Sequence, residues 1–508
     1  MNVNANVAAF VAIDLGAESG RVVVGRFGDG VVRLEEVSRF ANGPEELPDG
    51  LHWNIQELYR QCLAGIALAG RAQRLDGIAV DSWGVDYGLL DESRTLLGLP
   101  FHYRDRRTEG QVERAASRVS KSLMYETTGI GSMPINTVYQ LLAEETSATL
   151  AAAHRIALVP DLLNLWLCGV LANERTAAST TGLVDAKTGL WAADIIDRLG
   201  LPARIFGDLV DPGTVLAPLL AAHAAALHLP EGIPVIATAA HDTAAAFAGA
   251  PLSRPEVAVL ASGTWSLLGL EMDAPVLSEA ARLADLSNER GVFGKVRLLR
   301  NVMGLWLLQQ CRAGWCDADS APGYDELVSL AASAEGDTSL FDPDDSSLSC
   351  PGDVPARIAA MIRETGQPSP EGRGGLVRSI LVSLACKYRL VIEDLERCSG
   401  RSIQAIHVVG GGSRNQLLCQ LTANITRREV IAGPAEASAL GNVLMQAVAL
   451  GHLSGEEEAR EVARASVSVE RYLPTTDARG CDDIYRRFLK ATGLASAGRV
   501  GRVYRRST

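Results

Sequence analysis

The beginning of the chain alternates short apolar runs with turns of small and polar residues. The run VAAFVAID at residues 7–14 ends on a carboxylate, and RVVVGRF at residues 21–27 follows after the turn LGAESG. Two apolar runs on either side of a tight turn predict two adjacent β-strands. The run GIAVDSW at residues 77–83 predicts another strand, and residues 91–93 predict a hairpin turn between short strands.

Helical periodicity follows in the middle of the first half. Residues 141–153 and 161–167 carry apolar side chains at helical spacing, which predicts two helices. The run PVIATAA then predicts a strand that breaks at His241 and Asp242 into a further helix. The small residues after Asp242, in the sequence AAAFA, favour close packing of that helix against a neighbour.

The pattern of the first strands returns half a chain later. After residues 251–255, the sequence VAVLASGTWSLLGL repeats the order strand, small-residue turn and strand. This internal repeat predicts two related halves that face each other. A chain of 508 residues is too long for one ordinary core. We therefore expect two α/β domains, at residues 1–248 and 249–508.

The last part of the chain predicts a buried strand, a glycine turn and two helices. In IHVVGGGSRNQLLCQLTANI, the spacing of Ser413 and Gln416 is that of a helix capping box. Apolar residues from 440 to 448 predict the second helix, which ends at Gly451. The acidic, Ser-rich segment at residues 341–353 predicts a surface loop, and the basic residues 498–508 predict a solvated end.

Composition narrows the class of protein. Hydrophobic residues make up 47% and charged residues 21%, with a net charge of −12. The acidic balance argues against broad binding to nucleic acid or to anionic membranes. No apolar run approaches the roughly 20 residues that span a bilayer, and the first apolar run reads as a strand instead of a signal peptide. Nine cysteines at irregular spacing predict a reduced, cytoplasmic protein. The oligomeric state does not follow from these features.

The first turn, DLGAESGR, has the residues that a phosphate site needs. Small residues after a strand leave backbone N–H groups free for phosphate oxygens. Asp14 could hold Mg²⁺ through water, and Arg21 could pair with a phosphate. An ordinary hairpin with a polar turn is the alternative. Neither a Walker loop nor a dinucleotide fingerprint occurs here.

Two further turns have similar chemistry. Hydroxyl and backbone N–H groups around Thr264, in SGTWS, also suit phosphate oxygens. Gly411 lies in a triple-glycine turn that opens a helix, where a backbone can approach an anionic ligand, and Asn415 follows it. Each turn is common by itself. Together, turns from matching halves could hold one triphosphate from two sides.

His241, Asp242 and Thr243 form the candidate catalytic segment. Phosphoryl transfer to an alcohol needs a carboxylate that accepts the hydroxyl proton. Asp242 ends an apolar strand, where partial desolvation makes a carboxylate more basic. Asp242 as a helix cap is an equal alternative. His241 could hydrogen-bond a sugar, or it could be a buried histidine with internal partners.

Other polar groups lie in apolar surroundings. In WGVDYG, Gly84 offers a bare backbone to a sugar, with Asp86 nearby. Asn301 and Gln309 lie eight residues apart along one expected helix, with Asn301 near its start. An asparagine at that position is also an ordinary helix cap.

Taken in order, these segments resemble the FGGY family of carbohydrate kinases. The resemblance covers most of the chain. It rests on these motifs: DLGAESGR, DSWGVDYGLLD, GLPFHYRDRRT, AAHDTAAA, ASGTWSLLG, RNVMGLWLLQQ, HVVGGGSRN and AGPAEASALGN. It implies two actin-like (ribonuclease H-like) ATPase domains with a central cleft, and the cofactors ATP and Mg²⁺. Within the family, the match is closest to the members that convert L-rhamnulose to L-rhamnulose 1-phosphate.

The resemblance also implies a role for each site residue. Asp242 would be the catalytic base, and Asp14 would hold Mg²⁺ through water. The implied ATP contacts are Ala17, Glu18, Ser19, Gly20, Arg21, Thr264, Gln309 and Gly411. The implied sugar contacts are Gly84, His241, Asp242, Thr243 and Asn301.

One position departs from the family pattern. Glu18 stands where many sugar kinases carry Ser or Thr, and a carboxylate repels a triphosphate. We expect its side chain to turn away or to pair with Arg21. The alternatives for function are a kinase for another ketose, such as L-fuculose or D-xylulose, and an actin- or chaperone-like ATPase switch.

Overall fold

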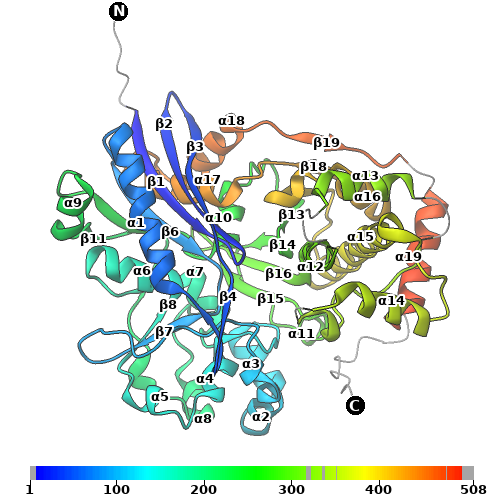
Figure 1. Cartoon of the computed structure of the whole chain (residues 1–508), viewed down its shortest axis with the longest axis horizontal. Helices are drawn as coiled ribbons and strands as arrows, with labels where there is room; N and C mark the ends of the chain where they lie inside the picture. The colour runs from blue at the N-terminus through cyan, green and yellow to red at the C-terminus, as the bar shows by residue number, and fades with distance from the viewer. Residues whose placement is uncertain (1–6, 316–321, 335–337, 351, 476–477, 495–508) are drawn as a thin grey trace, which may run out of the picture.

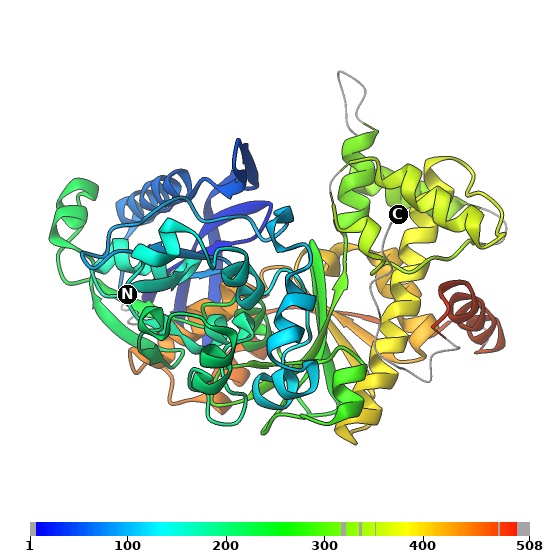
Figure 2. The same cartoon turned by 90° about the horizontal axis from the view of Figure 1, so that it is seen from below.

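The protein folds into two lobes that lie side by side, each built around one β-sheet (Figures 1 and 2). The smaller sheet belongs to the lobe that contains the N-terminal strands, drawn in blue in Figure 1. The structure is a computed structural model, and it describes residues 7–315, 322–334, 338–350, 352–475 and 478–494.

The first sheet has six strands in the order β11-β12-β6-β1-β2-β3. Their bounds are β1 (Ala8–Leu15), β2 (Ser19–Gly28), β3 (Val31–Ala41), β6 (Gly77–Ser82), β11 (Thr214–Pro218) and β12 (Pro234–Ala237). Strand β2 is antiparallel to both β1 and β3, whereas β6 is parallel to both β1 and β12. The strands predicted at the beginning of the chain are therefore present and paired across their turn.

The second sheet repeats this arrangement. Its bounds are β13 (Val257–Ser262), β14 (Trp265–Met272), β15 (Ser287–Arg290), β16 (Val296–Met303), β17 (Ala405–Val409), β18 (Glu429–Ala432) and β19 (Glu470–Tyr472). The order is β15-β16-β14-β13-β17-β18-β19. Strands β13, β14, β16, β17 and β18 match β1, β2, β3, β6 and β12 in order and in direction. The predicted relation between the two halves is confirmed.

Helices cover the faces of both sheets. The helices up to residue 250 are α1 (Ile55–Ala72), α2 (Gln111–Arg118), α3 (Lys121–Thr128), α4 (Thr137–Ala143), α5 (Ala148–Ala152), α6 (Val159–Cys168), α7 (Arg175–Ala178), α8 (Ala193–Leu199), α9 (Ala221–Leu227) and α10 (Asp242–Gly249). The later helices are α11 (Glu279–Leu283), α12 (Trp306–Gly314), α13 (Tyr324–Ser333), α14 (Val354–Glu364), α15 (Gly372–Ser399), α16 (Gln416–Thr426), α17 (Ala437–Ala449), α18 (Glu456–Ser466) and α19 (Ala478–Thr492).

The chain crosses between the lobes near its end. Helices α1 and α6 cover one face of the first sheet, and the other face packs on α17 and α18, which come from far beyond residue 249. The largest core cluster lies in the second lobe, where α15 and α16 pack on the sheet. The division into residues 1–248 and 249–508 stays a prediction, because the first lobe includes helices from the second range.

Helices α10 and α17 cross at the boundary between the lobes. A Cβ atom on Gly441 would lie 1.8 Å from the carbonyl oxygen of Ala245, and one on Gly249 would lie 2.1 Å from that of Ala437. Only glycine permits so close an approach of two backbones. The small residues expected after Asp242 therefore do pack closely, and α17 is the neighbour.

The remaining strands form three short two-stranded sheets. They are formed by β4 (Pro44–Leu47) with β5 (Gly50–Trp53), β7 (Tyr87–Leu90) with β8 (Arg155–Leu158), and β9 (Asn173–Glu174) with β10 (Leu209–Val210). The turn predicted at residues 91–93 exists, with the Asp91 N–H donating to Thr95. However, β7 pairs with β8 instead of with a strand after the turn, where Leu90 and Leu96 form only one bridge.

Two predicted helix features differ in the structure. The helix expected at residues 141–153 is two short helices, α4 and α5, because Ser147 caps a new helix at its own position by accepting from the Leu150 N–H. The capping box at Ser413 is absent. The Ser413 hydroxyl donates to the Gly410 carbonyl, and Asn415 caps α16 by accepting from the Leu418 N–H at 3.0 Å.

The segment at residues 341–353 is less exposed than its composition predicts. Phe341 is buried, and the carboxylates of Asp342 and Asp344 bind the buried Lys387 ammonium at 2.8 and 2.7 Å. The sequence cannot show this partner, because Lys387 lies in α15. Residues 498–508 lie outside the described residues. Among the helices described, none combines the length and the apolar character needed to cross a membrane.

Candidate active site

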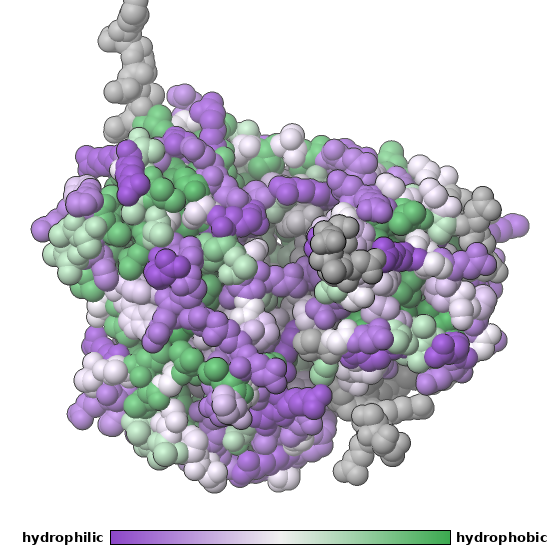
Figure 3. All heavy atoms as spheres, viewed as in Figure 1, coloured by the Kyte–Doolittle hydropathy of each residue, from purple (hydrophilic) through white to green (hydrophobic). Residues whose placement is uncertain are grey.

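A cavity of 930 Å³ lies between the two lobes and is lined by residues of both. Hydrophilic side chains border the boundary between the lobes in Figure 3. The carboxyl ends of β1, β12, β13 and β17 all lead into turns that reach this cavity. Ligands of open α/β sheets bind at that edge. The duplicated fold therefore brings turns that are far apart in the sequence to one place.

The turn after β1 forms the wall of the cavity on the first lobe. Asp14 and Arg21 are cross-strand partners, and the guanidinium of Arg21 donates to the Asp14 carboxylate at 2.7 and 3.0 Å. A second ion pair joins Arg21 to Glu436, at the start of α17. The expected pairing of Arg21 with Glu18 is not formed, because both sides of the guanidinium meet other carboxylates.

Glu18 lines the cavity and carries a perturbed carboxyl group. Burial raises the pKa of Glu18 to about 7, and the positive charge of Arg104 opposes this shift only in part. Glu18 therefore does not turn away from the cavity, and its predicted contact with ATP stays a prediction. At neutral pH a substantial fraction of this carboxyl is protonated, so it repels phosphate less than an ordinary glutamate would.

Gly20 has a different place from its neighbours. It is buried in β2, where a Cβ atom would meet the ring of Phe40 and the side chain of Leu15. Packing alone therefore requires glycine here, and Gly20 is not among the residues that line the cavity. Its predicted contact with ATP stays a prediction. Ala17 and Ser19 do line the cavity.

Three carboxylates gather beneath this turn. Asp14 pairs with Asp81 in the register of β1 and β6, and its charge also acts on Asp242. Burial, and then the charge of Asp14, raise the pKa of Asp81 well above its ordinary range. Asn442 donates to one carboxylate oxygen of Asp81 at 2.6 Å, while the other has no hydrogen-bond partner in the described chain. A cation beside these carboxylates would favour the ionised form of Asp81, so the cluster suits a hydrated cation.

Two turns of the second lobe face this region. Thr264 lines the cavity in the turn between β13 and β14, and its carbonyl accepts from the Trp306 N–H at the start of α12. The Gln309 side chain also faces the cavity, and its oxygen is buried with no partner in the described part of the chain. An acceptor left open in this way fits a ligand with hydroxyl or amino donors.

The triple-glycine turn has two packing glycines and one open glycine. Cβ atoms on Gly410 and Gly412 would lie 2.9 and 2.0 Å from atoms of Ser262 in β13. A Cβ on Gly411 would meet nothing within 4 Å, and Gly411 lines the cavity. The turn thus presents bare backbone to the cavity at Gly411. Asn415 also lines the cavity, although its side chain caps α16.

Asp242 is the first residue of α10, and its side chain faces the cavity with 28% exposure. The N-cap of α10 is His241, and no side chain among the described residues caps this helix. The alternative in which Asp242 serves as the cap is therefore not what the structure shows. Burial raises the pKa of Asp242, His241 lowers it and Asp14 raises it, with a net increase. Thr243 donates its hydroxyl to Asp242 at 3.0 Å.

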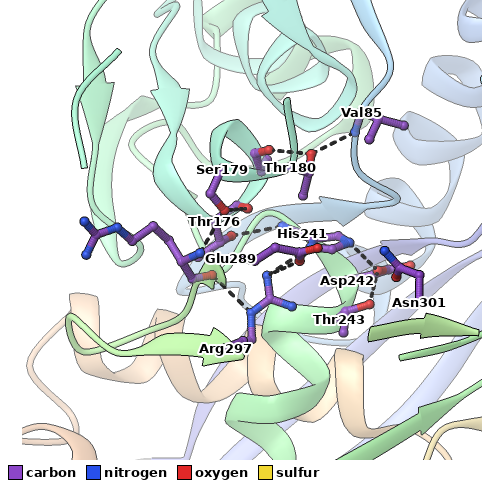
Figure 4. Close-up of polar contacts among 12 residues, drawn as sticks. Val85, Thr176, Ser179, Thr180, His241, Asp242, Thr243, Glu289, Arg297 and Asn301 are labelled. Carbon is purple, nitrogen blue, oxygen red and sulfur yellow. Dashed lines mark hydrogen bonds and ion pairs between the residues drawn. The ribbon is translucent and has the colours of Figure 1, made fainter. Parts of the chain in front are cut away.

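A buried ion pair holds His241 from behind (Figure 4). Nδ1 of His241 lies 3.3 Å from the Glu289 carboxylate and 3.1 Å from Nη2 of Arg297, and these two side chains pair at 2.9 Å. The other ring nitrogen, Nε2, faces Asp242 at 3.5 Å. Although burial alone would raise the pKa of Glu289, Arg297 and His241 hold it below its ordinary value. The imidazole is thus fixed between a buried ion pair and the candidate base.

The loop before His241 is held by a second buried carboxylate. Glu174 accepts from the Ala240 N–H at 3.1 Å, and Thr176 accepts from the His241 N–H at the same distance. Burial raises the pKa of Glu174 to about 7, against several hydrogen bonds that lower it. Both residues precede α10 by more than 60 positions, so only the fold shows their role.

Gly84, Val85 and Asp86 form a strained turn at the cavity. The Asp86 N–H donates to the Gly84 carbonyl at 2.9 Å, which makes Val85 the centre of a γ-turn with φ of 69°. A β-branched residue at positive φ is a true outlier. Gly84 lines the cavity, but a Cβ there would meet Thr180 at 2.8 Å, so packing also explains this glycine.

Asp86 holds the turn in place, and both of its carboxylate oxygens already accept hydrogen bonds from the protein. One carboxylate oxygen accepts from the indoles of Trp53 and Trp83 and from the Tyr103 N–H, and the other accepts from Gln140. Burial raises the pKa of Asp86 to about 6, and these hydrogen bonds oppose that shift. Asp86 is therefore structural.

Asn301 lines the cavity from a strand, not from the expected helix. It lies in β16, paired with Leu267 of β14, and α12 begins only at Trp306. Gly304 separates the two elements. A Cβ there would lie 2.7 Å from the backbone of Trp265, so the strand lies flat on β14 up to this point. Asn301 and Gln309 still reach one cavity, because the chain turns between them.

The structure brings together all the expected site residues except Gly20. The cavity is lined by Asp14, Ala17, Glu18, Ser19, Arg21, Gly84, His241, Asp242, Thr243, Thr264, Asn301, Gln309 and Gly411. Sequence reasoning missed the supporting residues Asp81, Glu174, Glu289 and Arg297. A hairpin over residues 287–303 would place Glu289 opposite Arg297, which is their register in the sheet. That pattern was the one available signal for the pair.

Comparisons with known proteins agree with this architecture. The N-terminal domain of the FGGY family of carbohydrate kinases matches residues 9–249, and the C-terminal domain of that family matches residues 258–450. Among solved structures, a gluconate kinase from Lactobacillus acidophilus has a TM-score of 0.78 at 16% identity, covering 97% of this chain and 99% of that chain. A xylulose kinase from Rhodospirillum rubrum has a TM-score of 0.75 at 21% identity, covering 96% and 98%.

Sequence relatives are more similar. A rhamnulokinase from Bacteroides thetaiotaomicron is 42% identical over 92% of this chain and 96% of its own length. A rhamnulokinase from Enterococcus faecalis is 38% identical over 96% of this chain and 98% of its own length.

The duplicated sheets and the cavity between them define the two-domain, ribonuclease H-like or actin-like ATPase fold of sugar kinases, as the sequence predicts. The chain belongs to the FGGY family of carbohydrate kinases, and it is a carbohydrate kinase that uses ATP.

Proposed function

We propose that this carbohydrate kinase phosphorylates L-rhamnulose to L-rhamnulose 1-phosphate in the breakdown of L-rhamnose. Its relatives at 42% and 38% identity are named rhamnulokinases, and they match nearly the whole chain. The observation that carries the mechanism is the position of Asp242. This partly desolvated carboxylate, whose pKa is raised, shares one cavity with the three turns proposed to bind phosphate.

The proposed roles follow from the walls of the cavity. ATP contacts come from the wall residues Ala17, Glu18, Ser19, Arg21, Thr264, Gln309 and Gly411. The family pattern adds Gly20, which is buried in β2 and does not line the cavity. Sugar contacts come from Gly84, His241, Asp242, Thr243 and Asn301. The nucleotide thus lies between the turns of the two lobes, and the sugar lies against the first lobe near α10. The open backbone at Gly411 and the Gln309 oxygen, which has no partner among the described residues, support a nucleotide in this place.

Asp242 accepts the proton of the sugar primary hydroxyl during transfer. The hydroxyl oxygen forms a bond to the γ-phosphorus while the bond from that phosphorus to the β–γ bridging oxygen breaks, which releases ADP. A raised pKa brings Asp242 closer to the range in which a general base is effective at neutral pH. His241 and Asn301 hold the sugar beside this carboxylate.

The carboxylates beneath the first turn fit a magnesium ion held through water. Asp14 is the proposed holder, with Asp81 behind it, because one oxygen of Asp81 has no hydrogen-bond partner in the described chain and a nearby cation would favour the ionised form of this carboxyl. Mg²⁺ supplies charge neutralisation to the phosphates. A cytoplasmic location, and the lack of nucleic-acid or membrane partners, remain predictions from the sequence.

A panel of ketoses with coupled ADP detection tests the proposal. L-Rhamnulose should give the highest kcat/KM, above L-fuculose and D-xylulose. A higher kcat/KM for one of the other two would replace the proposed substrate. Slow ATP turnover that no sugar accelerates would contradict sugar phosphorylation altogether and favour an ATPase switch.

A further inference from the structure

The strained turn at Val85 has no role in the chemistry described so far. Its conformation costs free energy, yet three side chains, those of Thr137, Gln140 and Thr180, hydrogen-bond the Val85 backbone and keep it in place. Backbone strain that its surroundings enforce in this way clusters at ligand sites. Val85 also lines the cavity, at the sugar end, next to Gly84.

Both backbone polar groups of Val85 are hydrogen-bonded to other residues of the protein. Its N–H donates to the Thr180 hydroxyl at 3.0 Å, and its carbonyl accepts from the Thr137 hydroxyl at 2.6 Å. Gln140 adds a longer contact to the same carbonyl at 3.4 Å. Val85 therefore offers a ligand only the apolar surface of its side chain.

A second apolar residue joins this wall through the same network. The amide of Gln140 donates to the Ile135 carbonyl at 2.9 Å and to the Asp86 carboxylate at 2.8 Å. Ile135 lines the cavity as Val85 does. One buried side chain, Gln140, thus ties both apolar wall residues to the anchor of the strained turn.

Two polar residues, Asn136 and Thr180, line the cavity beside this wall, but their side chains are hydrogen-bonded within the protein. The polar side chains proposed to bind the sugar come from other segments. In Figure 4, Val85 and Thr180 are well separated in the view from Asp242, Thr243 and Asn301. The primary hydroxyl at C1 of the ketose must lie at Asp242 to lose its proton. The far end of a six-carbon ketose, C6, then extends away from Asp242 along the cavity.

We infer that Val85, together with Ile135, forms the subsite for the C6 methyl group of a 6-deoxyketose and selects against a hydroxyl at C6. This inference rests on the proposed function. A methyl group is the one apolar substituent of such a sugar, and Val85 can give nothing but apolar contact. A hydroxyl at C6 would lose its water there and find no hydrogen-bond partner on Val85.

L-Rhamnulose and L-fructose test this subsite, because they differ only in the replacement of the C6 hydroxyl by hydrogen. We expect the wild type to prefer L-rhamnulose by roughly 10–200-fold in kcat/KM, the usual range for one small apolar feature. Val85→Gly relieves the positive φ and removes the side chain, and Val85→Thr keeps the shape but adds a hydroxyl. In both variants the preference should fall by about tenfold or more, through kcat/KM for L-rhamnulose.

The result that overturns the inference is an equal loss of kcat/KM for both sugars. Val184→Ala, at a buried position that does not line the cavity, is the control for general destabilisation, and it should leave the preference unchanged. Failure of the proposed function gives a different pattern. If the wild type prefers L-fuculose, the pair L-fuculose and L-tagatose tests the same methyl subsite. If it prefers D-xylulose, which has no C6, both the function and the subsite are refuted.

Discussion

The carboxylate of Glu289 lies 3.3 Å from Nδ1 of His241, on the side of the imidazole ring opposite Asp242. Glu289 comes from β15 and His241 from the turn before α10, so the contact joins the second sheet to the proposed catalytic segment. The ring is thereby fixed in orientation, with Nε2 toward Asp242. Glu289 acts through His241, and it is a positioning residue.

Replacing Glu289 should impair both stability and sugar binding. Glu289→Gln leaves the fully buried Arg297 without its counter-charge, which we expect to cost about 3 kcal/mol of unfolding free energy. Because His241 also loses its fixed orientation, the KM for the sugar should rise more than the KM for ATP. Urea unfolding and steady-state kinetics measure the two effects.

Glu396→Gln is the matched control for this change. Glu396 pairs with Arg428 at 2.9 Å and does not line the cavity. It should lose stability, though less because this pair is more exposed, and both KM values should stay as in the wild type. If Glu289→Gln changes the two KM values equally, Glu289 supports the fold only.

Removing the base should stop turnover but not nucleotide binding. We expect Asp242→Asn to lower kcat by roughly 10²–10⁴, the range for a lost general base. In the wild type, kcat should fall as the pH drops through the raised pKa of Asp242, and this acid limb should vanish from the residual activity of the variant. Asp325→Asn makes the same change on an exposed part of the cavity wall, and it should leave kcat unchanged. A nearly normal rate in Asp242→Asn would exclude this role.

Glu18 should make nucleotide affinity depend on pH. Its pKa is about 7 in the folded protein and 4.5 ordinarily, so the carboxyl is neutral below pH 7 and charged above it. Affinity for MgADP should therefore fall as the pH rises through 7, because the charged form repels phosphate. The contribution of this pKa shift to folding stability depends on pH in the same direction. It is fully present below pH 4.5 and is lost as the pH rises through 7.

Glu18→Gln removes this titration. At pH 6 the variant should bind MgADP as the wild type does, and at pH 8 it should bind roughly fivefold more tightly, which corresponds to about 1 kcal/mol. Titration calorimetry at saturating Mg²⁺ measures the difference between the two proteins. Parallel pH profiles for both proteins would show that Glu18 does not face the phosphates.

The duplicated fold and most of the site were predictable from local patterns. Apolar runs followed by small-residue turns predict the strands whose ends reach the cavity. The residues of each turn also indicate which ligand groups the turn can bind, whatever its position in the fold. Asn301 shows where prediction from local patterns fails, because the apolar pattern around it fits a strand as well as a helix. The close contact of Gly304 with the backbone of Trp265, which decides for the strand, is visible only in the fold. Contacts between distant segments, such as Glu174 with the loop before His241, leave no local signal.

Lys387 illustrates the same limit and allows a stability test. Its ammonium is fully buried and binds Asp342 and Asp344, in a segment whose composition predicts a surface loop. Lys387→Met removes the buried ammonium that both carboxylates bind, and we expect a loss of about 3–5 kcal/mol in unfolding free energy. Lys187→Met, at an exposed position, should change stability by less than about 0.5 kcal/mol. Similar urea midpoints for the two variants would refute the importance of the buried cluster.

The crossing of α10 and α17 should control the position of Asp242. In Gly441→Ala the new Cβ would lie 1.8 Å from the Ala245 carbonyl oxygen, a backbone atom that cannot move alone. Helix α10 must then shift away from α17, and with it the carboxylate at its first residue. We expect lower stability and a fall in kcat, because even a small displacement of the base lowers the rate of phosphoryl transfer.

The same substitution has the opposite effect where space is open. Gly480 lies in α19, and a Cβ there would meet no atom of the described residues within 4 Å. Gly480→Ala should therefore stabilise the protein by up to about 1 kcal/mol through helix propensity alone. Thermal unfolding and kcat of the two variants distinguish the effect of the close helix contact at Gly441 from the effect of helix propensity at Gly480. If Gly441→Ala unfolds and turns over as the wild type does, the two helices can separate freely, and their contact does not position Asp242.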